Sequence, residues 1–208
     1  MSNKIYQVEK TNEEIIKTIL INILKMLGER KYIKKENITK IFTNLKSDQV
    51  DDLSYSLDLD DHKVGKIFAI KIIQQKITGI NRHNDLNNFL NNYKDTPKIV
   101  VTKEINKKAS QHIINNYPNT EIFLEEEFMI NLIDHLLIPK HEPLSDSERD
   151  EFFGSFAVKR RMMPKMLTGD PVSRYYNLKS GDVCRIIRPS EKSGFTTTYR
   201  LVIKGSIK

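Results

Sequence analysis

The chain has little cysteine and no long apolar run. Its single thiol, Cys184, excludes an internal disulfide framework and any zinc site built from several thiolates. We expect Cys184 to be a small buried apolar residue in a strand. The longest apolar run, TILINILKML from Thr18 to Leu27, contains Lys25, is too short to span a bilayer, and has no signal-peptide cleavage site. These absences predict an intracellular protein of a reducing compartment, with no membrane partner.

Motifs of known chemistries are also missing. The five histidines are scattered, and there is no H-E-x-x-H, Cys/His cluster, G-x-S-x-G elbow, P-loop or G-x-G-x-x-G. A metal-dependent nuclease would combine Asp60 or Asp61 with groups on the strand IFAIKI. Lys71 is present there, but Ala69 stands where the second carboxylate that holds Mg²⁺ should be. We therefore expect no catalytic residue, metal site, cofactor or small-molecule substrate.

Positive charge is concentrated in the last third of the chain. Residues 139–208 hold 14 Lys and Arg against 8 Asp and Glu, a net charge of +6, whereas residues 1–138 hold 20 against 19. A basic segment points to nucleic acid or an acidic protein surface as partner, and the alternative is a solvated basic face. Few stacking aromatics are spread along this segment, so direct reading of nucleic acid by it is not favoured.

The first part of the chain has the pattern of an α/β domain. Thr11 and Glu14 form a capping box for a helix that ends near Gly28, a residue suited to the left-handed position after a helix. The next expected elements are a helix at 35–45, a strand at 53–59, and then alternating strands and helices at 66–73, 85–95, 98–101, 106–118 and 120–124. This order implies right-handed βαβ connections.

Prolines mark a boundary after this domain. Pro139 and Pro143 prevent the continuation of a helix, so the segment that contains them separates two regions. Ser145 and Glu148 then form a second capping box, which predicts a helix through Phe153.

The stretch from Thr168 to Glu191 is explained by architecture rather than by catalysis. Asp170 can cap a short helix, and Pro171 fits its first position because the missing amide hydrogen costs nothing there. The strand VCRIIR is expected to end at Pro189 and to pair with TTTYRLVIK through a loop around Gly194. A unit of about 70 residues with so little core would be marginal alone, which suggests that it leans on a partner.

Two stretches, LIPKHEPLS and TGDPVSRYYNLKSGDVCRIIRPSEKSGFTTTYRLV, together closely resemble the C-terminal domain of the fifth subunit shared by eukaryotic nuclear RNA polymerases. In the archaeal enzyme the same domain constitutes a small subunit by itself. The matching elements are Pro139-Lys140-His141, Gly169-Asp170-Pro171, Arg174-Tyr175, Ile187 to Glu191, and Tyr199-Arg200. The first 138 residues are similar to the family's eukaryotic N-terminal domain through helix order and the KIVVTKE strand.

The resemblance implies two domains. Residues 1–138 would form an α/β N-terminal jaw domain of nuclease-like topology without nuclease function, and residues 139–208 a small α+β C-terminal assembly domain. Where the family usually carries Thr-Pro-Ser-Ala near downstream DNA, this chain reads Asn106-Lys107-Lys108-Ala109. The two lysines there would meet DNA phosphates without reading sequence.

The implied function is that of a non-catalytic subunit of DNA-directed RNA polymerase, whose catalytic magnesium belongs to the two largest subunits. The C-terminal domain would anchor on the largest subunit near the sixth subunit, and the N-terminal domain would form part of the jaw beside downstream duplex DNA. The residues expected to dock on partners are His141, Asp170, Pro171, Arg174, Tyr175, Arg188, Pro189, Glu191, Tyr199 and Arg200. The residues expected to face DNA are Lys103, Lys107 and Lys108.

The expected location is with the polymerase. That is the nucleus for a cellular eukaryote, and the virion or virus factory for a large DNA virus. The alternative function, from another class, is a free-standing basic DNA-binding protein; a metal-dependent nuclease ranks third.

Overall fold

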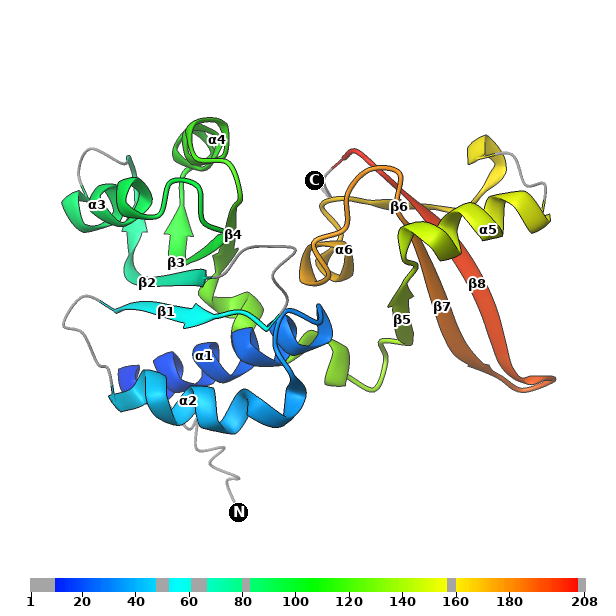
Figure 1. Ribbon diagram of the computed structural model, residues 1–208, viewed down its shortest axis with the longest axis horizontal. Helices are drawn as coiled ribbons and strands as arrows, with labels where there is room; N and C mark the ends of the chain where they lie inside the picture. Colours follow the sequence, from blue (N-terminus) through cyan, green and yellow to red (C-terminus); the bar gives the residue numbers. More distant parts are fainter. Residues whose placement is uncertain (1–9, 48–52, 61–66, 80–82, 157–159, 206–208) are drawn as a thin grey trace, which may run out of the picture. The chain divides into compact units, whose positions relative to one another are not determined.

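The computed structural model describes residues 10–47, 53–60, 67–79, 83–156 and 160–205. The chain divides into two compact units, Met1–Ile130 and Asn131–Lys208, drawn in Figure 1. The predicted mixed α/β organisation with two regions is confirmed, and the division falls earlier than the boundary expected after residue 138. Within the described residues, no helix is long and apolar enough to cross a membrane.

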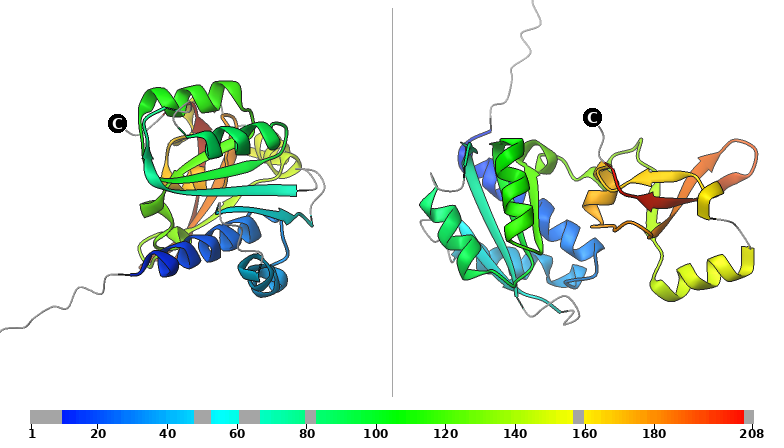
Figure 2. Two further views of the ribbon diagram at one scale, coloured as in Figure 1. Left: turned by 90° about the vertical axis from the view of Figure 1, so that its left-hand side faces the viewer. Right: turned by 90° about the horizontal axis from the view of Figure 1, so that it is seen from above.

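The N-terminal unit is built on a four-stranded sheet. Its elements are α1 (Asn12–Glu29), η1 (Lys35–Asn37), α2 (Ile38–Ser47), β1 (Ser54–Asp58), β2 (Ile67–Ile77), α3 (Asn84–Asn92), β3 (Lys98–Ile105), α4 (Lys107–Asn116), β4 (Thr120–Leu124) and η3 (Glu125–Phe128). The strand order is β1-β2-β3-β4, with β1 antiparallel to β2 and the other pairs parallel. The expected strand–helix–strand units are present, with α3 and α4 on one side of the sheet and α1 and α2 on the other (Figures 1 and 2).

The start of α1 follows the predicted capping box. The Thr11 amide donates to Glu14 Oε2 at 2.9 Å, and the Glu14 amide donates to Thr11 Oγ1 at 3.3 Å. Two of the four amide groups that a helix start leaves without partners are thereby satisfied. The apolar face of the helix is buried on the sheet, with Ile19, Ile23 and Leu27 fully covered.

The end of α1 differs from the prediction. Gly28 lies inside the helix, and the left-handed position is taken by Lys31, with φ of 63°. The Tyr32 amide donates to the Leu27 carbonyl and the Lys31 amide to the Gly28 carbonyl, which is the bonding pattern of a Schellman ending. A Cβ on Gly28 would lie 3.2 Å from Ile38 Cδ1, so glycine lets α2 approach closely there, and a larger residue would require the Ile38 side chain to shift by a few tenths of an ångström.

The C-terminal unit is built on a second sheet of four strands. Its elements are η4 (Leu132–Asp134), β5 (Lys140–Pro143), α5 (Asp146–Phe156), η5 (Arg160–Met162), β6 (Lys165–Leu167), α6 (Pro171–Tyr175), β7 (Val183–Ser190) and β8 (Gly194–Ile203). The strand order is β5-β7-β8-β6, with β6 parallel to β8 and the other pairs antiparallel. The predicted pairing of the last two strands through Gly194, with φ of 71°, is confirmed.

The two faces of this sheet are covered by different helices. The side chains of Cys184, Ile186 and Val202 pack with Val172 of α6, on what we call the α6 face. Those of Val183 and Leu201 pack with Phe152 of α5, on what we call the α5 face. Because side chains alternate along a strand, even-numbered residues of β7 and β8 lie on the α6 face and odd-numbered residues on the α5 face.

Two proline-containing segments differ from the predictions. The segment around Pro143, expected to be a boundary, contains the edge strand β5, where a missing amide hydrogen is tolerated. Pro189 does not end its strand, since β7 continues to Ser190. The strand β5 pairs only with Cys184–Ile187 of β7. Beyond Ile187, β7 is therefore an edge strand on its β5 side. Pro189 lies in this edge segment, where its missing amide hydrogen removes no hydrogen bond to β5. The Ser145–Glu148 capping box is confirmed, and its helix continues to Phe156.

Candidate assembly surface

The helix α6 is shaped by Asp170. Its Oδ1 accepts from the Val172 amide at 2.9 Å, and Pro171 occupies the first position, as predicted. Pro171 is exposed, and Arg174 is half-buried in the last turn. Capping therefore holds a helix of one turn in place at the surface of the unit, where propensity alone would not sustain it.

Tyr175 lies inside the unit. Its side chain is 5% exposed, and its hydroxyl donates to Asn131 Oδ1 at 3.0 Å. The ring meets that of Tyr176 edge-on, with centroids 5.2 Å apart. Leu132 and Ile138 pack on the same core, which explains why the C-terminal unit begins at Asn131. With its ring buried, Tyr175 can contribute to a docking surface by holding α6 in position.

His141, Asp170 and Arg200 come together at the α6 face. His141 lies on β5 opposite Ile186, and its Nδ1 is 2.6 Å from the Pro139 carbonyl oxygen. Burial lowers the pKa of His141 below its ordinary value; the Arg200 guanidinium acts in the same direction, while the Pro139 carbonyl and the Asp170 carboxylate oppose it. Burial thus favours the neutral form of the His141 imidazole.

Cys184 lies in the core of the same face. It is fully buried in β7, as predicted, and burial raises the pKa of its thiol to about 11. A thiol that stays protonated at neutral pH is a poor nucleophile. Cys184 therefore serves packing, as the sequence indicated.

The remaining predicted docking residues are distributed along the hairpin of β7 and β8. Arg188, Pro189 and Glu191 are exposed, and Arg188 lies on the α6 face. Figure 1 shows the far ends of the two strands extending past β5 as a two-stranded ribbon. Tyr199 lies on the α5 face, where its ring packs on Phe152 with centroids 4.4 Å apart. The predicted set therefore divides between two faces of one sheet.

Phe195 is a surface residue that the sequence reasoning missed. It is 72% exposed and lies opposite Pro189 on the α5 face of the ribbon. Its sequence signal, an aromatic residue in a strand pattern, normally indicates the core. The ring is exposed because β7 and β8 extend beyond the helices that cover the rest of the sheet.

Two residues of the failed nuclease pattern, Ala69 and Lys71, are buried in the N-terminal unit. Ala69 lies in the hydrophobic cluster beneath α3 and α4. Lys71 is 2% exposed, and its Nζ donates to Ser54 Oγ at 3.0 Å. Asp60 accepts from the Lys34 amide at 2.7 Å, and Asp61 lies outside the described residues. In the described ranges, no group of three His, Cys, Asp or Glu side chains is placed to hold a metal ion.

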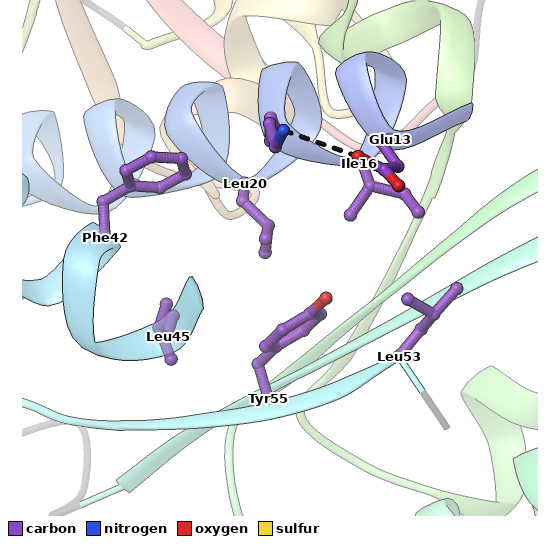
Figure 3. Close-up of a pocket in the computed structure, with 8 residues that line it drawn as sticks. Glu13, Ile16, Leu20, Phe42, Leu45, Leu53 and Tyr55 are labelled. Atoms are coloured by element: carbon purple, nitrogen blue, oxygen red, sulfur yellow. Dashed lines mark ion pairs between the residues drawn. The ribbon is translucent and has the colours of Figure 1, made fainter. Parts of the chain in front are cut away.

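A small apolar cavity lies between α1, α2 and β1 (Figure 3). Its volume is about 40 Å³, enough for about one water molecule. Leu20, Phe42 and Tyr55 line it, and an ion pair of 3.7 Å between Glu13 and Lys17 crosses its rim. Sites for drug-sized ligands are usually several hundred cubic ångströms in volume, so this cavity does not suit one.

The three lysines expected to face DNA are exposed and lie around the connection from β3 to α4. Lys103 lies near the carboxyl end of β3, and Lys107 and Lys108 begin α4. Asn106 makes no side-chain capping bond, and the first turn contains no acidic residue. Cations at a helix start are opposed by the helix dipole by about 0.3–1 kcal/mol each, whereas anions are attracted there. The start of α4 therefore places two lysines at the positive end of the helix dipole.

The comparisons with known proteins identify the family. Residues 130–202 match the family described as RNA polymerase Rpb5, C-terminal domain. The chain is 34% identical over 209 residues to DNA-directed RNA polymerase subunit 5 of Acanthamoeba polyphaga mimivirus, with 97% of this chain and 98% of the relative covered. The chain belongs to the RNA polymerase fifth-subunit family. This confirms the resemblance drawn from the sequence motifs.

A cellular relative agrees with this assignment. The fifth-subunit chain is 30% identical over 219 residues to subunit rpabc1 of DNA-directed RNA polymerases I, II and III of Dictyostelium discoideum, with 97% of this chain and 98% of the relative covered. As a member of this family, the chain is a non-catalytic subunit of DNA-directed RNA polymerase. The alternative of a free-standing DNA-binding protein is set aside, because the similarity to polymerase subunits spans both units.

Proposed function

We propose that the C-terminal unit anchors this fifth subunit on the largest polymerase subunit near the sixth, through the α6 face. The observation that carries this proposal is the grouping of His141, Asp170 and Arg200 on that face, with Arg188 exposed farther along the same side of the sheet. In the described chain, no carboxylate forms an ion pair with Arg188 or Arg200. Two guanidinium groups without an ion pair on one face suit an acidic protein surface.

Charge reversal on this face tests the anchor. The double variant Arg188→Glu with Arg200→Glu is expected to co-purify with the polymerase at a tenth of the parent level or less, since like charges across an interface cost several kcal/mol. The matched control is Lys165→Glu, an exposed change on the α5 face. Quantitative immunoblotting of the purified polymerase gives the comparison. If the double variant is incorporated as well as the control, the α6 face is not the anchor.

The same proposal places the N-terminal unit in the jaw, beside downstream duplex DNA. Support comes from the exposed Lys103, Lys107 and Lys108 and from the uncapped start of α4. We expect these lysines to contact phosphates, which carry no sequence information, so the contact would be independent of sequence. The subunit would work wherever its polymerase works, in the nucleus of a cell or in the virion or factory of a large DNA virus.

The salt dependence of DNA retention tests this contact. Lys107→Glu with Lys108→Glu is expected to leave assembly unchanged and to make the plot of log affinity against log salt shallower by roughly 2, because each lost phosphate contact removes about 0.9 from the slope. The measurement is binding of assembled polymerase to a downstream duplex over a salt series. Lys10→Glu with Lys40→Glu is the control, as both lysines are exposed and Lys40 lies on α2, in the opposite layer. Equal slopes for the two double variants would remove the jaw contact.

A further inference from the structure

The ribbon of β7 and β8 has two outer edges of different character. The two strands pair along their whole length, from Val183 with Leu201 to Ser190 with Gly194. The strand β6 covers only Leu201–Ile203 of β8, and β5 covers only Cys184–Ile187 of β7. Beyond these points the ribbon has no further strand partner within the described chain. Its backbone edges are therefore open to pairing.

The edge of β7 is blocked, and the edge of β8 is not. Pro189 lies on the open part of β7 and has no amide hydrogen to offer a neighbour. The open part of β8, GFTTTYR, contains no proline and no lysine, and its three consecutive threonines favour extended backbone. Natural proteins usually protect a long open edge with such residues. An edge without them is suited to accept a strand.

The backbone of Thr197 faces this open edge. On β8, the Leu201 amide donates outward to the Pro164 carbonyl at 2.9 Å, whereas the Val202 amide donates to the Asp182 carbonyl, on the β7 side, at 2.8 Å. Because the direction alternates along an antiparallel strand, Thr197 has the outward direction of Leu201. No hydrogen bond of the Thr197 amide or carbonyl to the outer side is present in the described part of the chain.

The side chains beside this edge specify the chemistry of an added strand. On the α6 face lie Arg188, opposite Thr196, and Arg200, and neither forms an ion pair in the described residues. On the α5 face lie the exposed ring of Phe195 and the side chain of Pro189. A strand beside β8 would therefore carry acidic side chains toward the α6 face and apolar side chains toward the α5 face, in alternation.

We propose that the open edge of β8 receives an extended segment of another polymerase subunit as an added strand. The segment alternates acidic and apolar side chains, binds the Thr197 amide and carbonyl through its backbone, and covers Phe195. Backbone pairing supplies affinity, and the alternating side chains supply specificity. This inference rests on the proposed anchoring through the C-terminal unit, and it names the form of the partner at that surface.

Thr197 offers a matched pair of variants. Thr197→Pro removes the outward amide hydrogen without removing a hydrogen bond to β7, whereas Thr197→Val keeps the backbone and removes only the hydroxyl. We expect Thr197→Pro to reduce co-purification with the polymerase at least tenfold and Thr197→Val to remain within twofold of the parent. Thermal unfolding of both free variants establishes that each is folded. Normal incorporation of a folded Thr197→Pro chain would overturn the proposal.

A second measurement needs no proline. Hydrogen exchange of the Thr197 amide is expected to be at least tenfold slower in assembled polymerase than in the free chain, because pairing protects amides from water. The buried, high-pKa thiol of Cys184 is slow to react, so Thr197→Cys provides one reactive site for crosslinking to the neighbouring segment. A crosslink to an acidic, apolar-alternating segment of another subunit supports the proposal, whereas a crosslink between two copies of this chain, or none at all, overturns it.

The outcomes separate this inference from the anchor itself. If Arg188→Glu with Arg200→Glu abolishes incorporation while Thr197→Pro and the exchange rate of the Thr197 amide are unaffected, the anchor stands and the added strand is wrong. If the charge reversal has no effect but Thr197 is protected and crosslinked, the β8 edge binds a partner and the α6-face anchor is wrong.

Discussion

Replacing Lys98 with methionine is expected to lower the free energy of unfolding of the N-terminal unit by about 2–4 kcal/mol, because the carbonyls of Lys94 and Thr96 lose their donor and each acceptor left without one costs about 1–3 kcal/mol. The Tyr93 carbonyl still accepts from the Thr96 amide. Lys98 begins β3 and is fully buried. Its Nζ donates to the carbonyl oxygens of Tyr93 at 2.8 Å and of Lys94 and Thr96 at 3.1 Å. Methionine retains the apolar stem and removes these bonds, so the loop between α3 and β3 loses its central donor.

The control for this change lies on the same strand. Lys103 is exposed, and Lys103→Met is expected to alter the free energy of unfolding by less than about 0.5 kcal/mol. Urea denaturation followed by circular dichroism measures both. A Lys98→Met chain as stable as Lys103→Met would show that the loop carbonyls find water instead, and that the buried ammonium does not hold the loop.

Replacing Arg30 with methionine, as a separate single variant, is expected to lower the free energy of unfolding by about 3–5 kcal/mol, because it leaves a partly buried carboxylate without its partner. Arg30 follows α1, and its side chain is 2% exposed. Its two terminal nitrogens bind the two oxygens of Glu121 on β4, at 2.7 and 2.8 Å. This bidentate pair joins the end of the first helix to the last strand of the sheet.

A double variant distinguishes the loss of the pair from the loss of packing. Arg30→Met with Glu121→Met is expected to recover most of the stability, since no charge is then left unpaired. Lys17→Met, which breaks an exposed pair of 3.7 Å with Glu13, is expected to cost under about 1 kcal/mol. If the double variant is less stable than Arg30→Met alone, the ion pair is not the reason for the loss.

Some features of the fold are readable from the sequence because they depend on neighbours in the chain. The capping boxes Thr11–Glu14 and Ser145–Glu148 and the Asp170 cap are all predicted correctly, since each joins residues two or three positions apart. The alternation of strands and helices in the N-terminal unit follows from periodicity for the same reason. The family assignment also comes from local motifs, and the two relatives confirm it.

Other predictions are wrong because a local rule is overruled by a distant element. The local pattern assigns Gly28 to the helix end, but the helix continues through Gly28 to Glu29, and Ile38 of α2 packs closely on this position. The local pattern also assigns Pro189 to the end of a strand. In the structure β7 continues to Ser190, because β5 pairs with β7 only as far as Ile187 and proline is tolerated on the edge beyond it. Neither neighbour can be identified from the residues on either side of the glycine or the proline.

The sequence by itself determined where the capped helices begin, how strands and helices alternate in the N-terminal unit, where positive charge is concentrated and to which family the chain belongs. The tertiary structure alone decided that Lys98 is buried among carbonyls, that Tyr175 lies inside its unit, that His141, Asp170 and Arg200 meet on one face, and that the β8 edge stays open. The physical reason is that caps and periodicity depend on residues within a turn or two. Burial and charge pairing depend instead on strand register, which brings together residues far apart in the chain.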